Sequence, residues 1–301
     1  MGDQKLSLEK AIEQGRRYLE SEHQEGCFLS SVSPSRDMVD YQLSPREVFS
    51  TIVILDTLLK GQVDNETTKL SLQYIEKQRQ RGLFTFFEDR RIYPPDTDTN
   101  ALGYSVLLES GSISEHKANQ VLDTILSYQD QDGLVQVWLS RDRTNQKDPV
   151  VGANAVYLAH SLGRGSEVTP TEKWLLHHLD SGDYLNGSRY YPSPDSFLYF
   201  INRLTRFPGL AEEMRNKLST ALQERIGTTE YPLDLAMRIS VADSLGIPDK
   251  LEKQRLLRLQ NQDGSWPADA LFHYGSKQGY FGSKAITTAF SLKALRIASF
   301  E

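Results

Sequence analysis

Two kinds of amphipathic pattern alternate along the chain. In the stretch from Leu210 to Ile226, apolar residues recur at spacing four between acidic and basic side chains, the pattern of a helix with one apolar stripe. Residues 48–59, 150–162 and 285–297 are instead apolar on nearly all sides. A helix of that kind is buried all round. The alternation predicts polar-faced outer helices packed around buried inner ones.

A short repeated phrase closes each predicted outer helix: a polar residue, three residues, a glycine, one residue and usually an aromatic. Its full form is Gln260-x3-Gly264-x-Trp266. The six glycines of the copies are Gly26, Gly82, Gly133, Gly182, Gly227 and Gly264. They lie roughly 37 to 56 residues apart, a period typical of helical-hairpin repeats. Each glycine supplies the left-handed residue that stops a helix. Six hairpins closed into a ring predict an all-α fold, an (α/α)6 barrel, as a single domain over residues 1–301.

Prolines mark the expected starts of the inner helices, since proline favours the first helical position. They are Pro45, Pro95, Pro149, Pro194 and Pro232, and the sixth inner helix is expected to start at Ser283. We expect a capping box between Ser44 and Glu47, and caps from Asp148 and Ser193. Because outer and inner helices alternate in direction, all six inner N-termini should meet at one mouth. Several carboxylates should gather there with them: Asp96, Asp98, Asp148, Asp195 and Asp234.

Composition narrows the class of protein. The net charge is -6 and no basic run is present, which argues against a nucleic-acid partner. The single cysteine, Cys27, excludes an internal disulfide and fits a reducing compartment. No signal peptide and no apolar run of membrane-spanning length are apparent. We therefore expect a soluble, cytoplasmic protein with no integral membrane segment, and the oligomeric state stays open.

The segment from Pro94 to Asn100 carries the candidate chemistry, directly after the aromatic loop 83–87. Asp96 and Asp98 are two residues apart, so on a regular helix they would point roughly 200° apart. We expect Asp96 to cap the helix and Asp98 to turn inward. The alternative is a polar helix start rich in capping residues. A carboxyl group at the mouth of an aromatic-lined barrel is costly to bury, which favours a functional role.

These residues carry a family resemblance. Asp96-Thr97-Asp98-Thr99 resembles the Asp-x-Asp-Asp or Asp-x-Asp-Thr signature of class II terpene cyclases. The phrase around Gln260 and Trp266 resembles the glutamine–tryptophan repeat of squalene–hopene cyclases. Repeats and signature together span nearly the whole chain, whose length matches one barrel, as in the cyanobacterial meroterpenoid cyclases. Two departures are that Thr99 stands at the fourth signature position and that one repeat alone keeps tryptophan.

The resemblance implies a reaction in which an acid protonates a terminal alkene or epoxide and a carbocation then closes rings. It implies that Asp98 is the acid, that Asp96 holds it through a hydrogen bond or shared proton, and that Thr99 anchors the turn. An apolar barrel would keep such a carboxyl neutral. Asn154, in the neighbouring inner helix, is a candidate donor to the carboxylate that remains, or else a buried amide satisfied by backbone.

Carbocations need aromatic faces rather than anions along their path. The candidate lining residues are Phe49, Trp138, Tyr157, Tyr191, Phe197, Phe200, Phe272 and Phe281. Each is also an ordinary core residue by composition. Phe49, Phe197, Phe200 and Phe281 are favoured because they lie near inner-helix starts. Trp266 is expected to pack its own repeat together. Water, His273 or Tyr274 could take the final proton, and the sequence does not select among them.

A single barrel suits a prenyl chain of about fifteen to twenty carbons. We expect a small-molecule prenylated substrate with an aromatic acid head group, and a prenyl diphosphate is the alternative. Arg141, Arg143 and Lys147 could meet the acidic head at the mouth. No cofactor is required by this chemistry and no metal ligand set is predicted, although Mg²⁺ could accompany a diphosphate. A glycosidase pairing Asp98 with Asp148, Asp195 or Asp234, and a non-catalytic binding scaffold, remain alternatives. A zinc prenyltransferase is disfavoured, because Cys27 stands alone.

Overall fold

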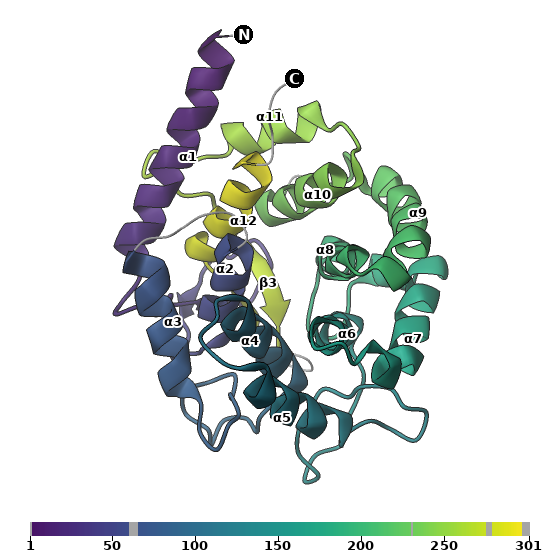
Figure 1. Cartoon of the computed structure of the whole chain (residues 1–301). Helices are drawn as coiled ribbons and strands as arrows, with labels where there is room; N and C mark the ends of the chain where they lie inside the picture. The colour runs from purple at the N-terminus through teal and green to yellow at the C-terminus, as the bar shows by residue number, and fades with distance from the viewer. Residues whose placement is uncertain (1, 60–65, 230, 275–278, 297–301) are drawn as a thin grey trace.

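The computed structural model describes residues 2–59, 66–229, 231–274 and 279–296. The chain is mostly helical, as expected, and two sets of helices alternate along it (Figure 1). The outer set consists of α1 (Gly2–Glu22), α3 (Glu66–Gln78), α5 (Glu115–Leu126), α7 (Thr169–Asp180), α9 (Pro208–Arg225) and α11 (Lys250–Arg258). The inner set consists of α2 (Phe49–Leu59), α4 (Thr97–Glu109), α6 (Pro149–Ser161), α8 (Pro194–Asn202), α10 (Pro232–Leu245) and α12 (Lys284–Arg296).

The inner helices form a closed ring. Each contacts the next one along the chain, and α12 returns to contact α2. Outer helices surround them, with α3 packed on α2, α5 on α4, and so on around to α1, which packs on α12 (Figure 1). Almost every residue of α2, α4 and α6 is buried, which agrees with their all-round apolar sequences. Ile297, at the end of one predicted inner stretch, lies outside the described residues.

The repeated phrase follows the outer helices, but its glycine closely follows the helix in two cases only. Gly182 and Gly227 lie two residues beyond α7 and α9, and the other four glycines lie in turns four to seven residues beyond their helices. All six of its glycines have a positive φ, between 75° at Gly182 and 89° at Gly26. At Gly264 a Cβ atom would come within 2.5 Å of the Gln14 carbonyl oxygen on α1, so the last hairpin meets the first helix backbone to backbone. Gln260 donates from Nε2 to the Ala11 carbonyl at 2.8 Å, and the buried Trp266 donates from Nε1 to the Leu256 carbonyl at 2.7 Å. This copy of the phrase thus packs the last hairpin onto the first.

The predicted helix starts are confirmed in three cases and displaced in two. Pro149, Pro194 and Pro232 are the first residues of α6, α8 and α10. Pro45 and Pro95 lie before their helices, which begin at Phe49 and Thr97. Asp148 and Ser193 accept backbone N–H bonds as caps, and Ser283 accepts from Ile286 N–H just before α12.

The capping box predicted between Ser44 and Glu47 is wrong. Ser44 donates its hydroxyl to the Pro45 carbonyl instead, and Glu47 itself accepts from Ser50 N–H at 2.8 Å. The reason is that α2 begins at Phe49, which puts Glu47 rather than Ser44 within reach of the free N–H groups of the first turn.

A small antiparallel sheet, which the sequence did not predict, lies at the end of the ring where the inner helices begin. Its four strands are β1 (Ser31–Ser33), β2 (Gln42–Leu43), β3 (Ala270–His273) and β4 (Tyr280–Gly282), in the order β2-β1-β4-β3. β1 pairs with β4, so loops of the first and last hairpins are joined across the sequence. Within the described residues, no helix has the length and hydropathy needed to cross a bilayer.

Candidate active site

The start of α4 fixes the two candidate carboxyl groups. Pro94 and Pro95 hold the approach to the helix extended, and Asp96 is the N-cap residue with φ -127° and ψ 157°. Its carboxylate accepts from the backbone N–H of Thr99 at 2.7 Å and from the Thr99 hydroxyl at 2.8 Å. Because Asp96 is outside the helix and Asp98 is in its first turn, the two side chains do not diverge as they would on a regular helix. The predicted roles of Asp96 as cap and Thr99 as turn anchor agree with these bonds.

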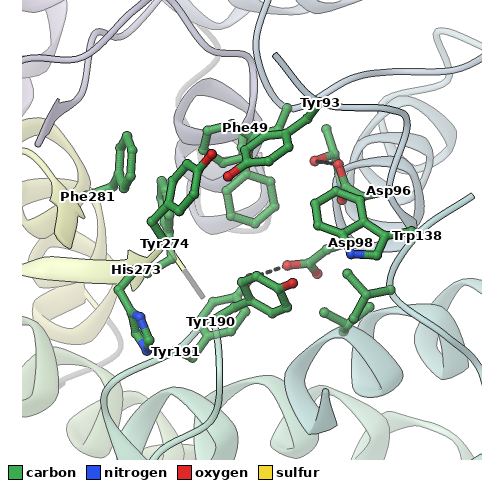
Figure 2. A pocket seen from close by; sticks show the side chains of 15 residues that line it. Phe49, Tyr93, Asp96, Asp98, Trp138, Tyr190, Tyr191, His273, Tyr274 and Phe281 are labelled. Carbon is green, nitrogen blue, oxygen red and sulfur yellow. Dashed lines mark hydrogen bonds between the residues drawn. The ribbon is translucent and has the colours of Figure 1, made fainter. Parts of the chain in front are cut away.

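Asp98 receives two hydrogen bonds from other parts of the ring. Asn154 on α6 donates from Nδ2 to Oδ1 at 2.8 Å, and the hydroxyl of Tyr191, in the loop before α8, donates to Oδ2 (Figure 2). The expected donor contact from Asn154 is therefore present, and the backbone-satisfied alternative is not. The expected hydrogen bond between the Asp96 and Asp98 carboxyl groups is not seen among the described contacts, and the two Asp96 oxygens accept from Thr99 instead.

Burial sets the protonation of this pair. Both carboxyl groups are largely buried, with Asp96 6% and Asp98 9% exposed. This burial raises the pKa of Asp98 to about 7 and that of Asp96 to about 6. The hydrogen bonds from Tyr191 and Asn154 pull the pKa of Asp98 the other way and limit the rise. Burial, with the nearby Asp98 charge, also raises the pKa of the Tyr191 phenol well above its usual value. Tyr191 therefore stays a neutral donor while Asp98 titrates near neutrality.

Asp98 faces a cavity with an empty volume of about 560 Å³, part of it open to solvent. Nine of its fifteen lining residues carry Phe, Tyr or Trp rings, and Figure 2 shows these rings around the space that Asp98 faces. The lining comes from the starts of α2, α4 and α6, the loops before α4, α6 and α8, and strands β3 and β4. One end of the ring therefore holds the cavity, as the alternation of helix directions predicted.

Five of the eight aromatic residues predicted from the sequence line this cavity: Phe49, Trp138, Tyr191, Phe272 and Phe281. The other three do not. Tyr157, in the third turn of α6, packs under the Arg203 guanidinium at 4.0 Å. Phe197 stacks on Tyr184 with ring centres 5.8 Å apart and faces away from the ring interior. Phe200 lies behind Tyr191, with ring centres 5.7 Å apart. The wall next to α8 is formed by Tyr190 and Tyr191 in the loop before it, so nearness to a helix start did not identify the lining residues there.

Three further aromatic wall residues were not predicted from the sequence: Phe86, Tyr93 and Tyr190. The apolar wall residues Val137 and Val151 were not predicted either. Phe86 belongs to the aromatic loop already noted beside the aspartates, and Tyr93 directly precedes the two prolines of α4. Both positions were recognisable from their proximity to Asp96. Tyr190 neighbours the predicted Tyr191. His273 and Tyr274, considered as terminating bases, both line the cavity, and burial lowers the pKa of His273.

Backbone contacts fix Trp138 opposite Asp96. The N–H of Thr97 donates to the Val137 carbonyl at 2.7 Å, and Leu139 N–H donates to the Pro95 carbonyl at 3.0 Å. On the other side, the Asn145 side-chain amide accepts from the backbone N–H of Trp138 and donates to the Trp138 carbonyl. Arg143, which is exposed, lies over the Trp138 ring at 4.6 Å. A cationic side chain therefore stands over the aromatic rim of the cavity.

The remaining carboxylates near this end of the ring are committed elsewhere. Asp195 forms ion pairs with Arg225 and Arg238, each at 2.8 Å, and Asp234 pairs with Arg36. Asp148 caps α6. Among the described lining residues, Asp96 and Asp98 are the carboxylates. Among all the residues that the structure describes, no three His, Cys, Asp or Glu side chains gather in a way that could hold a metal ion.

Comparison by sequence connects the chain to terpene cyclases. Residues 12–161 match the model of the sesquiterpene cyclase AstC-like C-terminal domain family. The drimenol cyclase DrtB of Aspergillus calidoustus is 32% identical over 206 residues. That match covers 67% of this chain and 38% of the relative, so the chain spans about two fifths of that relative's length.

Comparison by structure gives the same fold. A variant of the type II terpene cyclase MstE from Scytonema, solved with geranylgeranyl dihydroxybenzoate, superposes with a TM-score of 0.72 at 14% identity and 99% coverage of both chains. The ent-copalyl diphosphate synthase of Streptomyces platensis gives a TM-score of 0.62 at 15% identity, over 83% of this chain and 50% of that enzyme. At these identities the likeness shows the fold.

Proposed function

Because this chain belongs to the sesquiterpene cyclase AstC-like C-terminal domain family, whose model matches residues 12–161, we propose that it is a class II cyclase. In this proposal Asp98 starts the reaction. Asp98 transfers its proton to a terminal alkene or epoxide of a linear prenyl chain. The carbocation then adds to successive double bonds, and a final base removes a proton. The proton gained equals the proton lost, so the reaction is an isomerisation.

The observation that carries the proposal is the Asp98 carboxyl group, which has a pKa of about 7 and faces a wall of aromatic rings. An alkene is a very weak base, so its protonation requires an acid that is neutral, desolvated and followed by a stabilised conjugate base. Burial supplies the first two conditions at Asp98. The donors Asn154 and Tyr191 supply the third, since both remain bonded to the carboxylate after the proton leaves.

The wall suits the cations that follow. Ring faces of Phe49, Phe272 and Phe281 attract positive charge without forming bonds to it. Asp96 and Asp98 are the carboxylates among the described lining residues, and both lie at one side of the cavity. This arrangement also disfavours the glycosidase alternative. A second acid at the required separation would have to be Asp148, Asp195 or Asp234, and none of them lines the cavity.

The substrate we propose is a prenyl chain of about fifteen carbons, the length that defines a sesquiterpene, carrying a diphosphate head. The family model and the drimenol cyclase relative support this length. Arg143, at the rim over Trp138, is placed to meet the anionic head. The geranylgeranylated aromatic acid expected from the sequence is the second candidate, favoured by the fold shared with MstE. Mg²⁺ would accompany the diphosphate only.

We also assign the ring of six inner and six outer helices to the (α/α)6 barrel class. The support is the closed order of contacts among the inner helices, from α2 through α12 and back to α2. The assignment gives the cavity a physical basis. The starts of α2, α4 and α6 line it, and Asp98 lies in the first turn of α4, where the helix dipole favours the negative charge that remains after proton transfer.

The test is a product assay in D2O. Purified protein is incubated with farnesyl diphosphate, geranylgeranyl diphosphate or geranylgeranyl dihydroxybenzoate, with Mg²⁺ or with EDTA. An acid that exchanges with solvent should give a cyclic isomer carrying one deuterium, with farnesyl diphosphate the preferred substrate. Asp98→Asn should lower turnover by about a thousandfold. Asp89→Asn, a surface carboxylate in the preceding loop, is the matched control and should leave turnover unchanged. Unlabelled or absent products from all three substrates would refute the proposal.

A further inference from the structure

A buried chain of hydrogen bonds continues from Asp98 away from the cavity. Asn154, whose Nδ2 donates to Asp98, accepts at Oδ1 from Nη1 of Arg203 at 2.8 Å. Arg203 then donates from Nη2 to Asp56 Oδ1 at 2.7 Å. The four residues come from α4, α6, the 3-10 turn Arg203–Arg206 and α2, and each is at most 9% exposed. A path through the ring interior therefore links four separate elements.

The donors in this chain determine which way the Asn154 amide points. A guanidinium has five N–H donors and no acceptor, so the Asn154 atom that faces Arg203 must be the carbonyl oxygen. The NH2 group then faces Asp98. Arg203 is itself held on two sides, by the Asp56 carboxylate and by the Tyr157 ring at 4.0 Å. Burial opposes its charge, but the charge of Asp56 and the neighbouring acidic and phenolic groups together outweigh burial and raise the pKa of Arg203.

The orientation matters because an amide can either donate to a carboxyl group or accept from it. With its NH2 toward Asp98, Asn154 stabilises the carboxylate form alone. With the carbonyl turned toward Asp98, it would accept the acid's own proton and stabilise the neutral form. A carboxyl group bonded in that second way is a weaker acid, and its proton is engaged when the alkene arrives.

We propose that Arg203, anchored by Asp56, is a positioning residue that locks the Asn154 amide with its NH2 toward Asp98, so that the Asp98 proton stays free for the substrate. The effect on the reaction rests on the proposed function. The effect on the proton affinity of Asp98 does not need a substrate, so the two are measured separately.

The test variant is Asp56→Asn with Arg203→Gln, because removing Arg203 alone would leave a buried carboxylate unpaired. Glutamine offers both an acceptor and a donor, so Asn154 can turn. The readout is the infrared carboxyl stretch of Asp98, isolated by subtracting the spectrum of the same protein with Asp98→Asn and followed against pH. We expect the protonation midpoint to rise by about one pH unit, a tenfold gain in proton affinity. The matched control is Arg206→Gln, in the same 3-10 turn, which should leave the midpoint unchanged.

Turnover supplies the second readout. The double variant should show a tenfold lower kcat with KM within twofold of the original, and the alkaline limb of its kcat profile should move to higher pH. Arg203→Lys keeps the charge and a donor, and should retain the original midpoint. A midpoint that does not move in the folded double variant would overturn the inference.

If the double variant fails to fold, neutron diffraction from deuterated crystals of the unaltered protein decides the orientation. Deuterons on the Asn154 atom nearer Asp98 support the lock, and deuterons on the atom nearer Arg203 overturn it. If the double variant shifts the protonation midpoint of Asp98 but the protein cyclises none of the substrates, the proposed function is wrong and the role of Arg203 in orienting Asn154 is supported. Cyclisation with an unmoved midpoint would do the reverse.

Discussion

Asp98 has a higher pKa than a surface carboxylate because its charged form is buried away from water. Desolvation is the largest cause of its raised pKa, and the two donors act against it. The neighbouring Asp96 raises the pKa further through its charge, without a direct hydrogen bond between the carboxyl groups. The buried surroundings of Asp98 favour its neutral form, so the free energy of unfolding of the protein decreases when Asp98 ionises.

The first prediction at this scale concerns stability against pH. The pKa of Asp98 rises on folding from 3.8 to about 7, so in that interval the folded protein holds a proton that the unfolded chain releases. Stability should therefore fall as pH rises through the interval. Asp98→Asn does not titrate, so its free energy of unfolding relative to the original protein should increase from about pH 4 to 7, by up to a few kcal/mol, then level off.

Urea unfolding of both proteins at several pH values measures this difference. Asp269 also has a raised pKa, caused by burial and the charge of Asp234, and it cancels because it titrates in the same way in both proteins. Asp96 and Asp148 interact with the Asp98 charge, so loss of that interaction is part of the measured difference. A stability difference that is the same at every pH would show that Asp98 ionises as easily in the folded protein as in the unfolded chain.

Single residues were predictable where the signal was local. Asp96, Asp98 and Thr99 lie within four positions of one another, and proline and capping chemistry set their geometry. Asn154 was found because it lies on the adjacent inner helix. The bond from Tyr191 to Asp98 spans 93 positions, and that from Arg203 to Asp56 spans 147. Contacts at such separations depend on the tertiary packing of the whole ring, which local patterns do not encode.

At the scale of elements, helices form the frame and loops and strands carry much of the wall. The six hairpins could be predicted because the connection inside each contains a glycine of positive φ and, in most cases, a proline or capping residue at the start of the inner helix. The strands could not, since β1 and β4 have three residues each and are stabilised by pairing with one another. Phe272, His273 and Phe281 reach the cavity on β3 and β4.

The second prediction is that the wall on these strands directs the products. Phe281 stacks on Phe272 with ring centres 5.3 Å apart and is 5% exposed, facing the cavity. Phe281→Leu removes one ring face from the cation's path, so we expect a changed ratio of products at similar substrate affinity. Chromatography of the product mixture measures it.

Phe197→Leu is the matched control for Phe281. The ring of Phe197 packs on His178 and Tyr184, away from the cavity, so its loss should lower stability by about 1–2 kcal/mol and leave the product ratio unchanged. If the two variants give the same product ratio, the strands do not form the working wall.

At the scale of the whole molecule, closure of the ring depends on the meeting of its first and last parts. α12 packs on both α1 and α2, and the phrase at Gln260 bonds to α1. Buried ion pairs reinforce the neighbouring arc, where Arg238 on α10 bonds to Asp195 on α8 and to Glu252 on α11. The frame that positions Asp98 and its donors is therefore held by contacts between hairpins as well as within them.

The third prediction compares two glycines of the repeated phrase. Gly264 and Gly82 share a left-handed φ, of 87° and 81°, so alanine at either position carries a similar backbone strain of about 1 kcal/mol. A Cβ at Gly82 meets nothing within 4 Å, whereas one at Gly264 would lie 2.5 Å from the Gln14 carbonyl oxygen. We expect Gly264→Ala to lose at least about 2 kcal/mol more stability than Gly82→Ala. Thermal and urea unfolding measure both, and equal losses would mean that α1 yields freely.

The pairing of β1 with β4 has a consequence for how the protein is made. Ser31 and Gly282 are partners in that ladder, so the strand that carries the wall residue Phe281 is paired with residues about 250 positions earlier. Contacts of such high contact order form late and slowly. A ribosome delivers residues 284–296 last among the described helices, and until they emerge the apolar faces of α1 and α2 that they cover stay open to solvent. Synthesis and early folding are thus the interval in which this chain depends most on protection from aggregation, and destabilising changes in α12 should reduce its yield before they reduce its activity.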